Sequence, residues 1–418
     1  MFSMATAVRW NREGDRREGG RSERLASAGL VAIIIGGAAF RNGPTRPSSD
    51  AVVAAGSPGA LVLVDDRSSR REAASGLAVL RGHVPLDVRD RFRVGSITKT
   101  FVAVIVLQLV NEHLLRLGDT VERWLPGVVP GGSRITVREL LAYRSGLANY
   151  ASDASFLRRT VAEPRRRWTP RQLVRVALAE GPVARPGKRF AYASTNYVLL
   201  GLVVERATGT SLERQLRGRI LAPLGLKGTS FVPGRRIPGG YAHGYAPTEH
   251  DGIVGSLATA RDRSKVSASM GLGRRRDRLR RSRSLPFPWF FCRAACFHLL
   301  GLMRPARGTR CGLGLAAFRT PCGTAIGPTG ALLGIVSAAW GSSDGRRRVV
   351  AMSNSFPLSP SADAAPRRLL DASFVELRSS RQGVLGRGVR RSRRAHPLPL
   401  PLLRHWLAAR PTERRVHR

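Results

Sequence analysis

Lysine and acidic residues are scarce in this 418-residue sequence, although the chain is strongly basic. Lysine and arginine together number 70 against 28 aspartates and glutamates, which gives a formal net charge of +42. Nearly all of these cations are arginines, because the lysines are limited to Lys99, Lys188, Lys227 and Lys265. A lysine at a motif position is therefore more informative here than in a chain of average composition.

The arginine runs lack the aromatic residues that usually accompany nucleic-acid binding. A charge of this size would suit nucleic acid or an anionic membrane. However, the runs at 274–283 (RRRDRLRRSR) and 387–396 (RGVRRSRRAH) contain no aromatic side chain and match no nucleic-acid motif. Nucleic acid is therefore not expected as a partner, and an anionic cell-envelope surface is the stronger candidate.

Near the N-terminus, the longest apolar run is short for a helix that spans a bilayer, which needs about 20 apolar residues. This run covers residues 25–40, follows a group of arginines and ends in small residues. The order of charged, apolar and small residues predicts a signal peptide. A membrane anchor and a buried core helix are the alternatives. We expect residues 1–50 to hold this segment and a Pro/Ser-rich linker at 43–50. The protein would then be secreted, or anchored at the outer face of a bacterial cell membrane.

Cysteine is also rare, and its spacing favours no metal site. The chain contains Cys292, Cys296, Cys311 and Cys322, some of which could pair in an exported protein. The spacing of Cys292, Cys296 and His298 matches no standard zinc pattern. The sequence therefore predicts neither a metal nor another cofactor.

The apolar share of 43% is enough for a buried core, and its periodicity changes along the chain. Residues 59–65 (GALVLVD) read as a strand that could pair with 73–80. Residues 96–117 are apolar on nearly every face, which predicts a helix buried within a domain. Further predicted helices cover 121–125, 136–143, 170–180, 197–208 and 211–220. The pair Thr136 and Glu139 predicts a capping box at one of them.

Strands return near the C-terminal end of the predicted domain. They cover 324–326, 334–340 and 348–352, with an Asp-Gly hairpin turn at 342–345 and a final helix at 364–377. The fold class is α/β (α+β): an antiparallel sheet flanked by helices and built from both chain ends, with an all-helical second domain. We expect this domain to cover 51–377, with an irregular segment at 265–310 that reads as low-complexity sequence rather than core, and a basic tail at 378–418.

Ser96 and Lys99 carry the clearest chemical signal. A serine hydroxyl needs an adjacent base to act as a nucleophile. In an S-x-x-K motif the two side chains lie one helical turn apart on the same face, so the amine can take the hydroxyl proton. A solvated helix surface is the simpler interpretation of a bare S-x-x-K. Here the motif opens a buried apolar helix, where an unpaired lysine would be costly, and this favours the catalytic interpretation.

The blocks around this motif resemble a known family. Four blocks carry the resemblance: FRVGSITKTFVAVIVLQLVNEHLLRLGDTVERWLPG, ITVRELLAYRSGLANY, FAYASTNYVLLGLVVERATGTSLERQLRGRILAPLGLKGTSF and GLGLAAFRTPCGTAIGPTGALLGIVSAAWGSSDGRRRVVAMSNS. Together they resemble serine D-alanyl-D-alanine carboxypeptidases and class C β-lactamases. The resemblance runs from about 59 to 377, is interrupted at 265–310, and leans toward exported carboxypeptidases at 143–147. It implies a β-lactamase/transpeptidase-like fold with the site between an α/β domain and a helical domain.

The resemblance also implies roles for residues far from Ser96. The Y-x-N motif of the family falls on Tyr192 and Ser194, so Tyr192 would relay a proton and Ser194 would bind the substrate amide more weakly than asparagine. A core tyrosine is the alternative. The H-x-G or K-T-G motif falls on 328–330, where an ordinary turn is the alternative. Thr329 and Gly330 would contact substrate, with Gly330 allowing close approach.

Two further expectations concern the strand motif. The backbone N–H groups of Ser96 and Ala331 would form the oxyanion hole. Pro328 replaces the side chain that in the family helps to bind a substrate carboxylate or to tune the tyrosine. His243 has no role in this mechanism and is expected in a loop, since no Ser-His-Asp triad is required.

The sequence therefore predicts a serine hydrolase that acts through an acyl-enzyme on D-alanyl-D-alanine peptides. Its partner would be a peptidoglycan peptide or a β-lactam. Three alternatives stay open: a β-lactamase or esterase on the same fold, a catalytically impaired penicillin-binding module, and a basic protein that binds cell wall or nucleic acid.

Overall fold

The structure is a computed structural model, and it describes residues 46–65, 70–231, 240–246, 261–264, 266–267, 303–304, 311–320, 323–332, 334–343 and 345–355. The chain divides into two compact units, Met1–Ser379 and Ser380–Arg418, and every described residue belongs to the first. The predicted signal segment at 1–45, the helix at 364–377 and the basic tail lie outside the described residues. Among the described helices, none has both the length and the apolar character that crossing a membrane requires.

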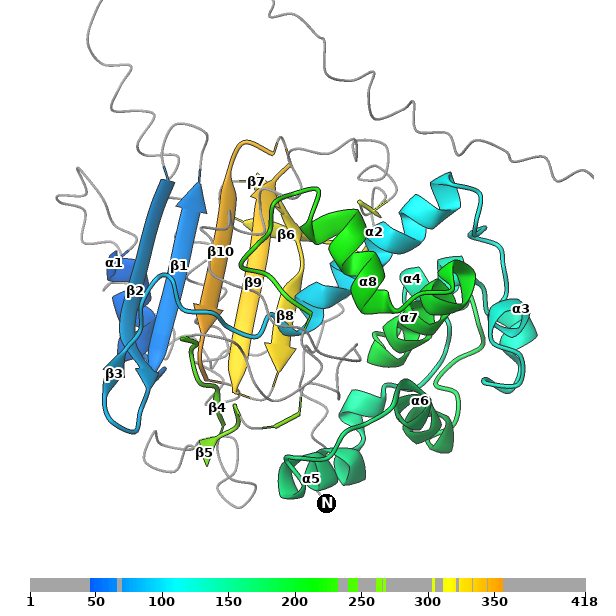
Figure 1. Ribbon diagram of the computed structural model, residues 1–418, viewed down its shortest axis with the longest axis horizontal. Coiled ribbons are helices and arrows are strands. Elements are labelled where there is room, and N and C mark those ends of the chain that lie inside the picture. Colours follow the sequence, from blue (N-terminus) through cyan, green and yellow to red (C-terminus); the bar gives the residue numbers. More distant parts are fainter. Residues whose placement is uncertain are drawn as a thin grey trace, which may run out of the picture. The chain divides into compact units, whose positions relative to one another are not determined.

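An eight-stranded antiparallel sheet forms one layer of the first unit (Figure 1). Its strands follow the order β3-β2-β1-β10-β9-β7-β6, and β8 also pairs with β9. The strands are β1 (Gly59–Asp65), β2 (Arg70–Val79), β3 (Val84–Pro85), β6 (Ala316–Thr320), β7 (Gly323–Gly327), β8 (Thr329–Leu332), β9 (Ile335–Ser342) and β10 (Arg348–Ser353). A separate ribbon contains β4 (Tyr245–Ala246) and β5 (Arg261–Asp262).

Strands from the two ends of the described chain lie side by side in this sheet. Ala60 of β1 pairs with Ser353 of β10, and Val64 pairs with Val349. The antiparallel pairing of β9 with β10 confirms the predicted hairpin. The expectation of an antiparallel sheet built from both chain ends is therefore confirmed.

Helix α1 (Arg46–Ala54) lies where the sequence predicted a linker, and this part of the prediction is wrong. Val52 of α1 packs against Val62 and Val64 on one face of β1. A hydrogen bond of 2.7 Å between the hydroxyls of Ser49 and Ser75 fixes the helix on β2. The proline near its start does not oppose this, because proline is tolerated in the first turn of a helix.

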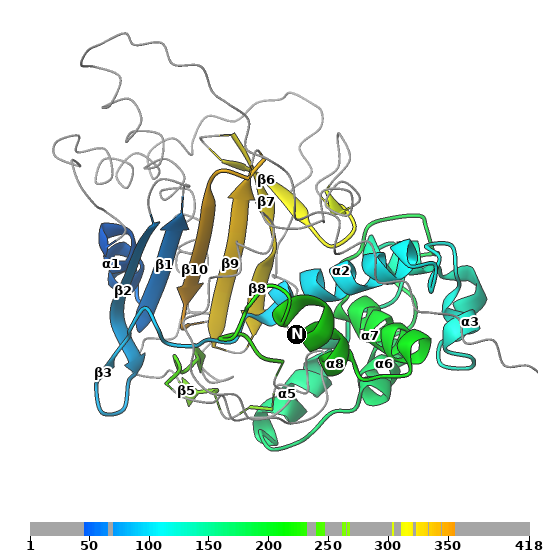
Figure 2. The ribbon, with the colours of Figure 1, turned by 45° about the horizontal axis from the view of Figure 1, so that its top comes forward.

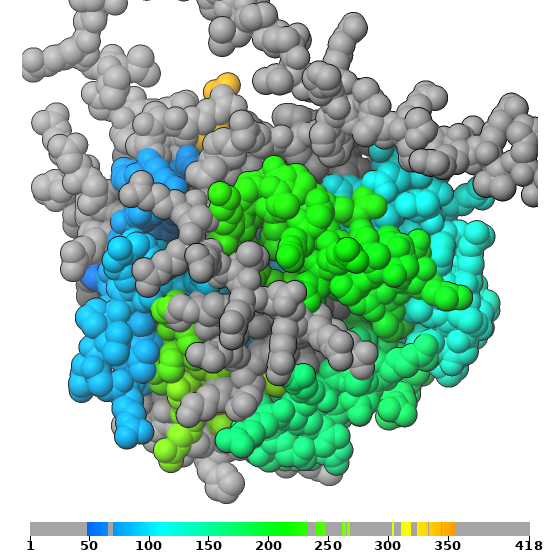
Figure 3. Space-filling view, viewed as in Figure 1, coloured from blue at the N-terminus to red at the C-terminus, as the bar shows by residue number. Residues whose placement is uncertain are grey.

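The other face of the sheet meets a helical layer. Figures 1 and 2 both show α2 starting beside β8 and running outward among the other helices. The helices are α2 (Thr98–Asn111), α3 (Val121–Trp124), α4 (Val137–Leu141), α5 (Ala154–Ala162), α6 (Pro170–Ala179), α7 (Ser194–Thr208) and α8 (Leu212–Leu216). Short helical turns are η1 (Gly95–Ile97), η2 (Gly132–Arg134), η3 (Tyr150–Ser152) and the π-helical η4 (Arg217–Leu221). Figure 3 shows one face of this unit, with the first strands in blue and the helical layer in cyan and green.

Helix α2 is the buried apolar helix that the sequence predicted, but it is shorter. Val102, Ile105 and Leu109 are fully buried in the largest core cluster. The helix ends at Asn111 because His113 adopts a positive φ of 60°, which no right-handed helix contains. Leu114, which was expected on the helix, is instead 49% exposed.

Capping explains most of the remaining helix boundaries. Thr136 and Glu139 form the predicted capping box of α4, and Thr169 with Gln172 forms a second one at α6. Helix α7 begins at Ser194, three residues before the predicted start. Helix α5 was not predicted, and Asp153 caps its first turn.

Parts of the segment 265–310 contribute to the core, contrary to the expectation from its composition. Val266 and Met303 are 4% and 1% exposed, and both belong to the largest core cluster. Apolar side chains that are this well buried stabilise the fold whatever the composition of the segment around them. The prediction of a segment outside the core is therefore wrong at these positions.

Candidate active site

Ser96 and Lys99 lie where the helical turn η1 leads into α2. The Lys99 Nζ donates a hydrogen bond of 2.7 Å to the Ser96 Oγ. Lys99 is 8% exposed, whereas Ser96 is half-buried. The structure thus presents an accessible hydroxyl with a buried amine directly behind it, as the S-x-x-K motif predicts.

Tyr192 reaches the same hydroxyl from the segment that precedes α7. Its phenol donates a hydrogen bond of 2.9 Å to the Ser96 Oγ, and its ring centroid lies 5.2 Å from the Lys99 Nζ. The structure therefore brings together three side chains that the sequence places on two separate blocks. A core tyrosine is excluded, because the Tyr192 side chain is 44% exposed.

The charge of Lys99 sets the acidity of Tyr192. Burial of the phenol raises the pKa of Tyr192, but the positive charge of Lys99 and hydrogen bonds with Lys99, Ser96 and Ser194 outweigh this effect. The net result is a Tyr192 pKa below its ordinary value. A phenol of this kind gives up its proton more readily, which suits a group that passes protons near neutral pH.

Ser194 lies at the start of α7, beside Tyr192. It is 8% exposed, and its side chain contributes to lowering the pKa of the Tyr192 phenol. Its backbone N–H donates to the Asn149 Oδ1 at 2.9 Å, so Asn149 satisfies a donor at the N-terminus of α7. The sequence analysis missed Asn149, because no local pattern marks a residue that caps a helix 45 positions away.

A second missed residue, Asn196, joins two helices beneath the site. It is fully buried, its Oδ1 accepts a hydrogen bond of 2.7 Å from the Ser145 hydroxyl, and its amide donates to the Leu140 carbonyl at 3.1 Å. Buried polar groups need such partners, so this network fixes α7 against α4. The available signal was a lone asparagine within an apolar helix.

Thr329 and Gly330 of the 328–330 motif begin strand β8, and Pro328 lies directly before it. Thr329 and Ala331 are exposed, whereas Pro328 and Gly330 are buried. A Cβ on Gly330 would overlap the carbonyl oxygen of Val94. Glycine is therefore required here by the protein's own packing against Val94, and contact between Gly330 and substrate stays a prediction.

The same close contact places Ala331 beside the nucleophile block. A Cβ on Gly95, the residue before Ser96, would lie 2.9 Å from the Ala331 nitrogen. The Ser337 hydroxyl on β9 also donates to the Val94 carbonyl at 3.2 Å. Two glycines thus allow β8 to pack directly against the turn that carries Ser96.

We expect Gly330→Ala to lower both stability and activity. The new methyl group would push β8 away from Val94, and overpacking of this kind costs about 1–3 kcal/mol. Thermal unfolding and the acylation rate of Ser96 are the measurements. Gly118→Ala is a matched control, because no atom lies within 4 Å of a Cβ at Gly118. A Gly330→Ala protein with unchanged melting temperature and rate would contradict this account of β8.

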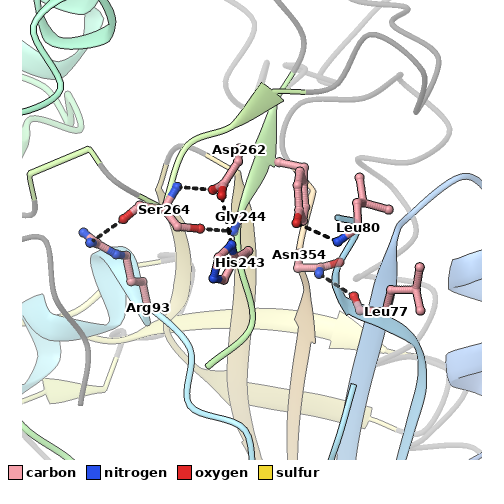
Figure 4. Close-up of polar contacts among 9 residues, drawn as sticks. Leu77, Leu80, Arg93, His243, Gly244, Asp262, Ser264 and Asn354 are labelled. Carbon is pink, nitrogen blue, oxygen red and sulfur yellow. Dashed lines mark hydrogen bonds and ion pairs between the residues drawn. The ribbon is translucent and has the colours of Figure 1, made fainter. Parts of the chain in front are cut away.

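His243 lies in the loop before β4, as predicted, in a polar cluster of its own (Figure 4). Its Nδ1 lies 2.9 Å from the Asp262 carboxylate. Asp262 accepts from the Ser264 backbone N–H at 2.8 Å, and Arg93 donates to the Ser264 carbonyl at 3.1 Å. These contacts fasten the ribbon of β4 and β5 to the strand connection that precedes Ser96.

No metal site is formed by the described part of the chain, where no group of three or more His, Cys, Asp or Glu side chains is placed to hold an ion. Cys292, Cys296, His298 and Cys322 lie outside the described residues. The described site presents a hydroxyl, an amine and a phenol.

Comparison with known proteins places this geometry in a family. The sequence matches the family model described as Beta-lactamase over residues 46–374. It is 30% identical over 182 residues to penicillin-binding protein 4* of Bacillus subtilis (strain 168), covering 42% of this chain and 39% of that protein. The chain thus matches less than half the length of this curated relative.

Two solved structures extend the likeness over more than three quarters of this chain. The D-stereospecific amidohydrolase from a Streptomyces species superposes with a TM-score of 0.62 at 30% identity, over 77% of this chain and 97% of that one. The D-amino acid amidase from Ochrobactrum anthropi SV3 superposes with a TM-score of 0.66 at 22% identity, over 81% and 98%. The second supports the fold alone. Taken with the family match, these comparisons show that the chain belongs to the β-lactamase/transpeptidase-like family of serine hydrolases.

Proposed function

We propose that the chain cleaves an amide bond next to a D-alanyl or related D-amino acid residue through an acyl-enzyme on Ser96. The observation that carries this proposal is the convergence of Lys99 and Tyr192 on the Ser96 hydroxyl, at 2.7 and 2.9 Å. These distances are within the range that proton transfer requires.

Each residue has a defined part in the proposed reaction. Lys99 first passes its own proton to the Tyr192 phenolate, and the neutral amine then takes the hydroxyl proton while the Ser96 Oγ attacks the substrate carbonyl carbon. Tyr192 passes a proton to the leaving nitrogen, which departs as an amine and leaves an ester on Ser96. Water then attacks this ester, gives up a proton to the same groups, and releases the acid and free Ser96.

Backbone and strand groups would stabilise the negative charge on the carbonyl oxygen. The N–H groups of Ser96 and Ala331 are the proposed oxyanion hole, since β8 packs directly against the turn at Gly95. Thr329 is exposed on β8 and is the proposed contact for the substrate beyond the cleaved bond.

The leaving group divides the proposal into two candidates. A D-alanyl-D-alanine carboxypeptidase releases an amino acid whose carboxylate needs a positive partner. An amidase or esterase releases a neutral group. Pro328 is buried and apolar at the position where related enzymes carry a cation or histidine, and this favours the second candidate. The 30% identity to a D-stereospecific amidohydrolase agrees with it.

A substrate panel tests both candidates together with the acyl-enzyme. Release of D-alanine from a D-alanyl-D-alanine peptide, of ammonia from D-alanine amide, and of product from a chromogenic cephalosporin would be compared. Intact-mass spectrometry after fluorescent penicillin treatment would locate the adduct. We expect one adduct, on Ser96, and faster turnover of the amide than of the peptide. If neither an adduct nor turnover is found, the proposed enzymatic activity is refuted, and the chain would be a module of the same fold that lacks activity.

The excess positive charge suggests where such an enzyme acts. The net charge of +42 would hold the protein against an anionic cell envelope, where peptidoglycan peptides are its proposed substrates. Secretion and anchoring remain predictions from residues 1–45.

A further inference from the structure

Tyr143 is a strained and buried residue directly behind the proposed active site. It follows α4, has a φ of 55° and is 9% exposed. A bulky residue at positive φ costs free energy and persists only where the surrounding structure enforces it. Such strain is concentrated at functional sites, so the contacts of Tyr143 are informative.

Both the ring and the backbone of Tyr143 hold the segment that carries Tyr192. The two rings stack with centroids 4.8 Å apart and planes inclined by 27°. The Tyr143 carbonyl accepts a hydrogen bond of 2.8 Å from the N–H of Ala191. One contact therefore fixes the plane of the Tyr192 ring, and the other fixes the main chain directly before it.

Tyr143 is itself fixed from behind. Its ring centroid lies 5.3 Å from that of Tyr197. Tyr197 in turn is fully buried and donates to the Leu141 carbonyl at 3.2 Å. The support for Tyr192 is thus anchored in the rigid pair of α4 and α7.

Tyr192 needs such support because its own surroundings are open. Its side chain is 44% exposed, and it belongs to a segment without regular structure. A ring free to turn would take its hydroxyl away from Ser96 and its face away from Lys99. We propose that Tyr143 is a positioning residue that holds the Tyr192 ring beside Lys99 and its hydroxyl on Ser96. The effect on turnover rests on the proposed function, but the effect on the Tyr192 ring does not.

The titration of Tyr192 gives a readout that needs no substrate. The groups that face it are Lys99, Ser96, Ser194 and the phenols of Tyr143, Tyr150 and Tyr197. The chain has 6 tyrosines. Burial acts to raise the pKa of all six, but at Tyr192 the charge of Lys99 and the hydrogen bonds outweigh burial, so the Tyr192 pKa alone is lowered. We therefore expect Tyr192 to form the first phenolate as pH rises.

Replacing Tyr143 distinguishes a positioning role from simple packing, because the two roles predict opposite changes in the Tyr192 pKa. If the Tyr192 ring swings away from Lys99, its pKa rises toward the ordinary value of about 10. If the ring stays in place, removing Tyr143 only reduces burial, and the Tyr192 pKa falls further. Positioning therefore predicts an upward shift, whereas packing alone predicts none or a downward one.

The experiment follows phenolate absorbance in the near ultraviolet during a pH titration of the full chain. Tyr192→Phe should remove the first rise in phenolate absorbance, hereafter the first step, and so assign this step to Tyr192. We expect Tyr143→Leu to move that step upward, and Tyr143→Phe to leave it unchanged because the stacked ring remains. Phe156→Leu is the matched control, since Phe156 is a buried aromatic residue that packs on Tyr150 and Trp168. It should lose a similar amount of stability and leave the first step unmoved.

Kinetics on the same variants tests the consequence for the reaction. A misplaced Tyr192 should lower the kcat of Tyr143→Leu by about 10- to 100-fold with little change in KM. Ala191→Pro is the second variant if Tyr143→Leu does not fold, because it removes only the hydrogen bond from the Ala191 N–H to the Tyr143 carbonyl. We expect it to shift the first step upward by less than Tyr143→Leu would. An unmoved or lowered first step in the folded variants would overturn the proposal. A wild-type protein that shows the step but forms no acyl-enzyme would instead overturn the proposed function.

Discussion

Ser96→Ala is expected to lower turnover by at least about 10⁴-fold and to abolish the covalent adduct with penicillin. The substitution removes the atom on which both Lys99 and Tyr192 converge, so neither has a proton to move. Ser96 is half-buried and fills no core space, so the melting temperature should stay close to that of the wild type. The measurements are steady-state rates on the preferred substrate and intact mass after penicillin treatment.

The control for this variant is Ser155→Ala, which removes an exposed hydroxyl on α5. It should react and turn over like the wild type. An adduct that persists in Ser96→Ala would show that another side chain is the nucleophile. Loss of the adduct in both variants would point to a folding defect, which the melting temperature would reveal.

Lys99→Met is expected to lower the acylation rate by about 10²- to 10⁴-fold, because the general base is lost while the nucleophile remains. Methionine has a similar length and is apolar, so it suits a side chain that is 8% exposed. Replacing a buried cation by an apolar group of similar shape is often neutral or stabilising. The melting temperature should therefore hold or rise while activity falls.

The same variant makes a second prediction about Tyr192. Burial raises the pKa of Tyr192 and the charge of Lys99 opposes it, so removing that charge should move the pKa upward. Near-ultraviolet titration of Lys99→Met would show this shift. Lys227→Met is the control, because Lys227 is an exposed lysine after α8. Wild-type acylation by Lys99→Met would exclude Lys99 as the base.

Local patterns were sufficient for the elements with their own capping or pairing signals. The short apolar runs at 59–65 and 348–352 predicted β1 and β10, and Thr136 with Glu139 predicted the start of α4. These signals act over a few residues, so tertiary contacts reinforce them rather than create them.

Boundaries were wrong where long-range contacts decide them. Helix α1 exists because Val52 packs on β1, which no property of 43–50 announces. Helix α2 ends at Asn111 although the apolar pattern continues, because His113 turns into the left-handed region. Met303 is buried despite its low-complexity surroundings. In each case packing overrode the local preference.

The sequence by itself determined the nucleophile, its neighbouring lysine and the family, because a spacing of three residues on a helix start fixes the geometry of Ser96 and Lys99 directly. The tertiary structure decided the rest of the site. It brought Tyr192 to Ser96 and stacked it on Tyr143, and it packed Gly330 directly against Val94. Contacts between segments far apart in the chain depend on how whole elements pack, and the spacing of residues within one segment does not predict that packing.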